Sequence, residues 1–164
     1  MKVLAIGCHP DDLEIACGGT LRKYVEEGAD VYMCHVANGN MGHVEILPEP
    51  LREIRTIESE AAGKIIGAKK VFNLDVGDVT VTRFDNDVVD AMADVVREVR
   101  PDVIITHNDE DYMQDHVETS RIAFNGSLYH HWHINLLISQ LMMSLFQSIL
   151  WIRWAASISF RRIT

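Results

Sequence analysis

The chain has 164 residues, 48% of them hydrophobic and 24% charged, which fits one globular domain with a buried core. Its formal net charge of -9, with no basic segment, predicts that it binds neither nucleic acid nor an anionic membrane surface. Met1-Lys2 leads straight into an apolar run rather than a leader, and the cysteines form no CxxC pair. We therefore expect a cytoplasmic protein with three reduced, packed thiols, Cys8, Cys17 and Cys34.

The first predicted element is a buried strand that ends in a cluster of ionisable side chains. Val3 to Ile6 has the length and branching of a parallel strand, and the cluster follows it: His9, Asp11, Asp12 and Glu14. These groups are costly to desolvate unless something pairs with them, and a divalent cation is the simplest partner. The same residues allow an alternative, in which Asp11 or Asp12 caps the next helix and His9 is a surface histidine.

Helices and strands alternate along the residues that follow. We expect helices over 15–28, 51–66 and 86–100, strands over 29–37, 70–75 and 102–106, and a fourth helix from about residue 116 that carries Ile122, Phe124 and Leu128. This alternation predicts an α/β fold, a Rossmann-like doubly wound and mainly parallel sheet with flanking helices and right-handed crossovers.

The helix over 51–66 carries two expectations of its own. Its apolar residues recur at helical spacing and predict the buried stripe Ile54, Ile57, Ala61 and Ile65, before Gly67 ends the helix. Arg55 and Glu58 are three residues apart, which predicts a surface ion pair.

Polar residues follow the predicted strands at the edge where an α/β sheet binds its ligand. The residues at these strand ends are His9, Asn38, Asp75 and His107. The glycine-punctuated segment 38–42 is either a plain turn or part of the mouth of a site. A second acidic loop, 106–116, ends in Asp115-His116. Two such loops supply two histidines and a carboxylate with an open position, which is typical of a catalytic rather than a structural zinc site.

Together these residues resemble the LmbE-like (PIG-L type) zinc-dependent N-deacetylases. The resemblance covers residues 1–128 and rests on the run His9-Pro10-Asp11-Asp12-Leu13-Glu14, Gly18-Gly19-Thr20-Leu21, Arg55-Thr56-Ile57-Glu58, Pro101-Asp102-Val103-Ile104 and Asp115-His116. It implies one Zn²⁺ per chain, held by His9, Asp12 and His116, with Asp11 as the general base.

The remaining expectations about the site concern substrate and supporting residues. The resemblance implies hydrolysis of the acetamide of a small N-acetylated amino sugar, such as N-acetylglucosamine, or of its conjugate. Supporting residues, which orient a ligand or bind substrate, are Asp115, Arg55, Asn38 and His107. Many members of the family carry a histidine three residues before the last ligand, and this chain has Met113 there. A thioether donates no hydrogen bond, so this position lacks an oxyanion donor unless His107 or another group compensates.

The tail departs from the family pattern. We divide the chain into an incomplete deacetylase domain, 1–129, and an atypical hydrophobic tail, 130–164, in which 134–152 carries no charge. A reading-frame error, a native packing helix or a membrane or partner contact would each explain the tail. If it is helical, Leu137, Leu141, Leu145 and Ile149 form a stripe. Its hydrophobicity predicts loose packing, self-association and a possible homo-oligomer.

Two rival functions remain open at this stage. A catalytically impaired metal- or sugar-binding remnant would keep the ligands without turnover. A nucleotide-binding Rossmann domain has only the fold class in its favour, because the sequence contains neither GxGxxG nor a P-loop.

Overall fold

The computed structural model describes residues 1–128 and 135–138. In chain order these residues form β1 (Lys2–Gly7), α1 (Asp12–Glu26), β2 (Asp30–Ala37), α2 (Pro48–Ile66), β3 (Lys70–Val76), α3 (Asn86–Val99), β4 (Val103–Thr106), α4 (Gln114–Leu128) and β5 (Asn135–Ile138). The strands form one parallel sheet in the order β3-β2-β1-β4-β5. The predicted doubly wound α/β fold is confirmed.

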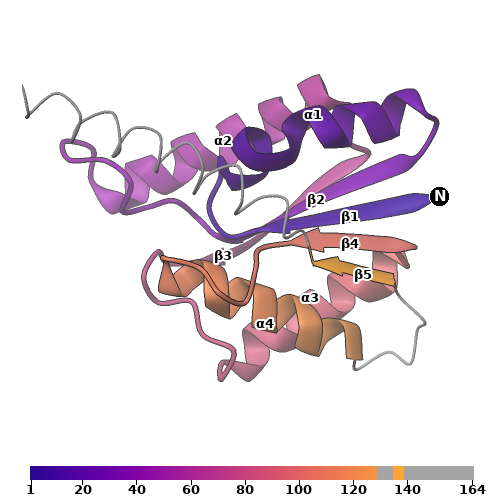
Figure 1. Cartoon of the computed structure of the whole chain (residues 1–164). Helices are drawn as coiled ribbons and strands as arrows, with labels where there is room; N and C mark the ends of the chain where they lie inside the picture. The colour runs from indigo at the N-terminus through magenta and orange to yellow at the C-terminus, as the bar shows by residue number, and fades with distance from the viewer. Residues whose placement is uncertain (129–134, 139–164) are drawn as a thin grey trace, which may run out of the picture.

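The sheet lies between two layers of helices, with α1 and α2 on one face and α3 and α4 on the other (Figure 1). β1 shows why its sequence is a continuous apolar run. Val3 and Ala5 join the buried cluster under α1 and α2, while Leu4 and Ile6 join the cluster on the opposite face. Because successive side chains of a strand point to opposite faces, a strand covered on both sides must be apolar throughout.

The strand order places a crevice beside β1. The chain runs outward from β1 through β2 to β3, then returns to place β4 on the other side of β1. The loops that follow β1 and β4 therefore start side by side and diverge to opposite faces of the sheet. In open α/β sheets this switch point is where ligands bind.

Three helices begin earlier than their periodicity predicts. α1 begins at Asp12 and α2 at Pro48, each three residues early, and α4 begins at Gln114. Pro48 fits the first turn because that turn has no intrahelical partner for its N–H groups. Gly67 ends α2 as predicted, in the left-handed region at φ 91°.

The predicted buried stripe of α2 is wrong. Ile54, Ile57 and Ile65 are 38%, 68% and 78% exposed, whereas the helix buries Leu51, Ser59, Gly63 and Ile66. The reason is the close approach of α2 to the sheet: a Cβ on Gly63 would lie 2.3 Å from Val71 Cγ2. α4 shows a similar departure, because Ile122 is buried but Phe124 and Leu128 are exposed.

β5 is the part of the tail that the structure describes. Asn135–Ile138 pairs with Val103–Thr106 in parallel register and covers the edge of β4. The helical stripe suggested for the tail is therefore wrong for these four residues. Residues 129–134 and 139–164 lie outside the described part of the chain, and so do the interpretations of them as a reading-frame error, a packing helix or a membrane contact. None of the helices described is long and apolar enough to cross a membrane.

A pair of glycine substitutions tests the packing of α2 on the sheet. We expect Gly63→Ala to lower the free energy of unfolding by about 1–3 kcal/mol, because the added methyl group overpacks against Val71. Gly19→Ala, in the interior of α1 with no other atom within 4 Å of its Cβ position, should be neutral or stabilise by up to ~1 kcal/mol. Urea denaturation of both variants measures the difference, and equal effects would contradict this packing.

Candidate metal centre

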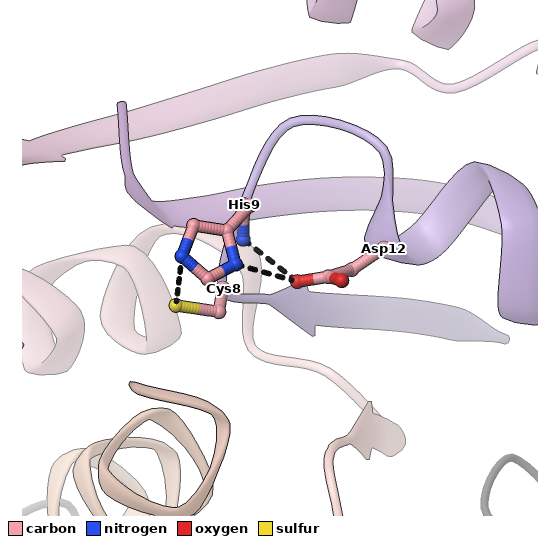
Figure 2. Close-up of side chains that lie close together, drawn as sticks. All are labelled: Cys8, His9 and Asp12. Atoms are coloured by element: carbon pink, nitrogen blue, oxygen red, sulfur yellow. Dashed lines mark hydrogen bonds and ion pairs between the residues drawn. The ribbon is translucent and has the colours of Figure 1, made fainter. Parts of the chain in front are cut away.

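The loop from β1 to α1 turns sharply and brings its polar groups to one point. The Asp11 and Asp12 N–H groups both point at the His9 carbonyl oxygen, at 2.9 and 3.3 Å. Gly7 permits the turn, since a Cβ there would lie 2.8 Å from Leu13 Cγ. The Asp12 carboxylate then folds back, and its Oδ2 accepts the His9 N–H at 2.7 Å (Figure 2). Asp11 makes no side-chain cap to the helix, so the capping alternative is wrong for Asp11.

The Asp12 carboxylate lies between the two histidines expected to bind metal. Its Oδ2 is 3.5 Å from His9 Nδ1 and 3.4 Å from His116 Nε2. A tetrahedral ion with bonds of ~2.0–2.1 Å separates its donor atoms by about 3.3–3.4 Å. Each imidazole nitrogen thus stands from the Asp12 oxygen at a separation that fits a zinc-sized ion, although the two histidines fall in different three-residue groups near enough to share one: Cys8, His9 and Asp12, and Asp12, His107 and His116.

A second carboxylate lies against the far nitrogen of each imidazole. Asp115 Oδ2 is 3.3 Å from His9 Nε2, and Asp111 Oδ2 is 3.3 Å from His116 Nδ1. A carboxylate at the far nitrogen holds the proton there and leaves the near nitrogen free to bind a cation. Both histidines therefore have the arrangement usual for metal ligands, with His9 Nδ1 and His116 Nε2 turned toward Asp12.

Backbone N–H groups hold these two outer carboxylates in place. Asp111 Oδ1 accepts the Met113 N–H at 3.0 Å, and Asp115 Oδ2 accepts the Val79 N–H at 2.7 Å. Val79 has φ 59°, a conformation that costs a β-branched residue on the order of 1–3 kcal/mol. The strained residue thus supplies a hydrogen bond to the carboxylate that orients His9.

Sequence analysis missed Asp111. It belongs to the run Asp109-Glu110-Asp111, which reads as a solvated acidic loop, and its spacing from His116 matches no ligand motif. In the structure its side chain is only 3% exposed. Asp115, by contrast, was expected to orient an imidazole, and the structure places it against His9.

His107 lies close to the centre, but its ring nitrogen makes a different contact from those of His9 and His116. Its ring stacks on His116 with centroids 4.1 Å apart, and its Nε2 lies 3.3 Å from Asp12 Oδ2. The same Nε2 accepts the Cys8 backbone N–H at 2.9 Å. The lone pair of this nitrogen is thus engaged by a backbone hydrogen bond. Although Asp12, His107 and His116 are near enough to share an ion, His107 is thus the weaker candidate.

Cys8 forms part of a second group that could share an ion. Its Sγ lies 3.7 Å from His9 Nε2, on the opposite side of the ring from Asp12 (Figure 2). The two neighbouring side chains can meet because β1 ends at Gly7, so the alternation of strand side chains does not extend to Cys8 and His9. Burial raises the pKa of the Cys8 thiol, which opposes the thiolate form that a metal requires.

The electrostatics of the imidazoles differ. Burial lowers the pKa of His9, but hydrogen bonding to Asp12 and Cys8 outweighs it and raises that pKa to about 11. Burial and the neighbouring His107 lower the pKa of His116, which favours its neutral, ligating form. A cation at His9 Nδ1 must therefore displace a proton, whereas His116 needs no such exchange.

Asp11 faces the cleft from the other side of the same turn. It lines a cleft of about 640 Å³ together with His9, Asp12 and His116. Its Oδ2 accepts a hydrogen bond from Arg55 Nη2 at 2.7 Å, and Arg55 also forms the predicted ion pair with Glu58. Burial and the adjacent Asp12 raise the pKa of Asp11, and the Arg55 guanidinium opposes that rise.

The segment 38–42 forms the mouth of the cleft, which Gly39, Met41 and Gly42 line. Asn38 does not line the cleft and donates to Asp75 Oδ1 at 3.1 Å. Asp78, which sequence analysis missed, holds the segment by accepting the Gly39 and Met41 N–H groups at 2.8 and 2.9 Å. Its position just after β3 could have identified Asp78 from the sequence, as the position of Asn38 after β2 did for that residue.

We expect removal of the Asp111 carboxylate to weaken metal binding. Asp111→Ala leaves His116 Nδ1 without its partner and should lower zinc affinity about 10- to 100-fold. Asp111→Asn should lose less, because the amide oxygen still accepts the Nδ1 proton. Asp109→Ala, an exposed acid of the same run, is the control. Competition with a chromophoric chelator measures all three, and equal affinities for the two alanine variants would contradict the assignment.

Comparison with known proteins identifies the family to which the chain belongs. Residues 4–126 match the model of the PIG-L family, GlcNAc-PI de-N-acetylase. The diacetylchitobiose deacetylase of Thermococcus kodakarensis is 35% identical over 106 residues, 63% of this chain and 39% of that protein. The N,N'-diacetylchitobiose deacetylase of Pyrococcus horikoshii superposes with a TM-score of 0.72 at 27% identity, over 78% of this chain and 49% of that one. The 4-carboxy-2-hydroxymuconate hydratase of Pseudomonas putida superposes with a TM-score of 0.71 at 27% identity, over 77% of this chain and 55% of that one. This chain thus spans roughly half of these proteins or less.

Proposed function

Because this chain belongs to the PIG-L family, we propose that it is a zinc-dependent hydrolase that removes the acetyl group from an N-acetylated amino sugar or its conjugate. The observation that carries the proposal is the shared Asp12 carboxylate, which faces His9 and His116 in the same cleft as Asp11. The diacetylchitobiose deacetylases among the similar proteins support the substrate class. The cleft, about 640 Å³, lies within the size range of small-molecule sites.

We assign the metal site to His9 Nδ1, Asp12 Oδ2 and His116 Nε2, with one Zn²⁺ per chain. Two imidazoles and one carboxylate are a usual ligand set for catalytic zinc, and the separation of Asp12 Oδ2 from each imidazole nitrogen fits it. When bound, such an ion supplies Lewis-acid activation of the amide carbonyl and of a water molecule.

Asp11 is the proposed general base. It stands beside a ligand without being needed as one, and its raised pKa brings it nearer to the range in which a carboxylate exchanges protons. Arg55 fixes Asp11 Oδ2, which leaves Oδ1 to take a proton from the attacking water and pass it to the leaving amine. Arg55 is therefore a positioning residue for Asp11.

Two matched substitutions separate chemistry from metal binding. Asp11→Asn keeps an oxygen for Arg55 and should retain one zinc per chain while amine release falls by at least about 10²-fold. Asp12→Asn should lose both the zinc and the activity. Metal analysis and amine release from a panel of N-acetylglucosamine conjugates measure these outcomes. An active Asp11→Asn variant would remove Asp11 from its role, and bound zinc without turnover of any acetamide would favour the catalytically impaired remnant.

The thioether at position 113 predicts a gain-of-function variant. Met113 lines the cleft, 37% exposed, and donates no hydrogen bond. His107 is no substitute, because it is buried and its Nε2 accepts the Cys8 N–H. Met113→His should add an oxyanion donor and raise kcat by up to about 10²-fold. Met113→Leu is the control, and equal kcat values for the two variants would show that the position needs no donor.

A second candidate function rests on the hydratase among the similar structures. That likeness favours addition of water to an activated carbon–carbon double bond in the same cleft, with Asp11 again moving the proton. Loss of the absorbance of a 2-hydroxymuconate without amine release from any acetamide would favour hydration.

We also propose a cytoplasmic location, which the three buried free cysteines support.

A further inference from the structure

The outer face of α2 carries an apolar stripe with no partner in the described part of the chain. Ile54, Ile57, Ala61 and Ile65 recur at intervals of three and four residues, so they share one side of the helix. All four are exposed, and α2 meets the sheet through its opposite side. Four such residues in line on one helix, together with exposed Leu47 just before it, are typical of an interaction surface.

The charges beside the stripe point to a particular partner. Glu53 and Lys64 are eleven residues apart, close to three helical turns, so both lie on the same edge of the stripe. Both are exposed, and neither forms an ion pair with another described residue. Glu60 lies between them on that edge. The edge therefore carries one positive charge, on Lys64, and two negative charges.

We propose that α2 is a self-association surface, through which two copies of this chain pack with their α2 helices antiparallel. Two-fold symmetry brings the same edge of both helices together, so Glu53 of one copy meets Lys64 of the second copy, twice per dimer. In a parallel pair this edge of the two copies would lie on opposite sides of the seam, so Glu53 and Lys64 could not meet.

The register that these charges require also matches the apolar residues. In an antiparallel pair centred near residue 59, Ile57 faces Ala61 of the second copy and Ile54 faces Ile65. A large residue thus meets a small one at the centre, which lets the helices approach closely. Ile65 also lines a groove of about 450 Å³ between α1 and α2, directly beside the stripe. The N-terminal half of the second copy's helix lies over this groove.

This arrangement reaches the edge of the candidate metal centre. Ile54 belongs both to the stripe and to the lining of the cleft. The C-terminal half of the second copy's α2 therefore lies beside the mouth of the cleft. The self-association surface does not depend on the proposed reaction, because measuring the oligomeric state tests it without any assay of activity.

Charge reversal tests the proposal on the full chain by sedimentation velocity over a concentration series. We expect the unmodified protein to dimerise, and Glu53→Lys or Lys64→Glu alone to weaken the dimer about tenfold or more. Mixing the two variants should restore dimerisation, because each heterodimer regains two pairs of opposite charge. A monomer at every concentration, or a mixture that fails to recover, would overturn the proposal.

A second pair of variants tests the apolar stripe. Ile57→Glu should abolish the dimer, whereas Ile15→Glu, at an exposed isoleucine of α1, should leave it intact. Circular dichroism melts confirm that both variants are folded. A dimer that persists in Ile57→Glu would show that another surface, such as residues 139–164, joins the two copies, and the proposal would fall.

Discussion

The Asp12 carboxylate is the group on which the arrangement of the centre depends. Its Oδ2 accepts the His9 backbone N–H and faces ring nitrogens of His9 and His116. Burial opposes ionisation of this carboxyl, but the surrounding imidazoles hold its pKa well below the usual range. His107 and His116 reach this carboxylate because β4 pairs beside β1, which brings the loop after β4 against the turn after β1. Fold and centre are therefore coupled through this one group.

The sequence predicted the fold from local rules, whereas the candidate metal ligands followed from the resemblance to the LmbE-like family. Apolar strands that alternate with helices specify a parallel sheet, and polar residues at strand ends meet at one edge. Sequence patterns did not identify Asp111, because its pairing with His116 depends on the path of the loop, which no periodicity describes. Asp12, the two histidines and Asp115 could be named from sequence, whereas Asp111, the carboxylate against His116, came only from the structure.

The α2 helix shows where periodicity chooses the wrong face. Hydrophobic spacing selects the side richest in isoleucine, but α2 packs through Ser59 and Gly63 because small residues permit close approach to β3. Close packing of the α2 backbone against the sheet therefore stabilises the fold more than burial of a few isoleucine side chains would. The same isoleucines are then left outside, where they serve contact with a second copy rather than the core.

X-ray absorption of the zinc-loaded protein tests the centre most directly, because it distinguishes the proposed ligands His9, Asp12 and His116 from the group Cys8, His9 and Asp12. We expect only nitrogen and oxygen neighbours at about 2.0–2.2 Å, with the multiple scattering of two imidazoles. A sulfur neighbour at about 2.3 Å would place the ion against Cys8 instead. That result would contradict the assignment of His116 and the role given to Asp111.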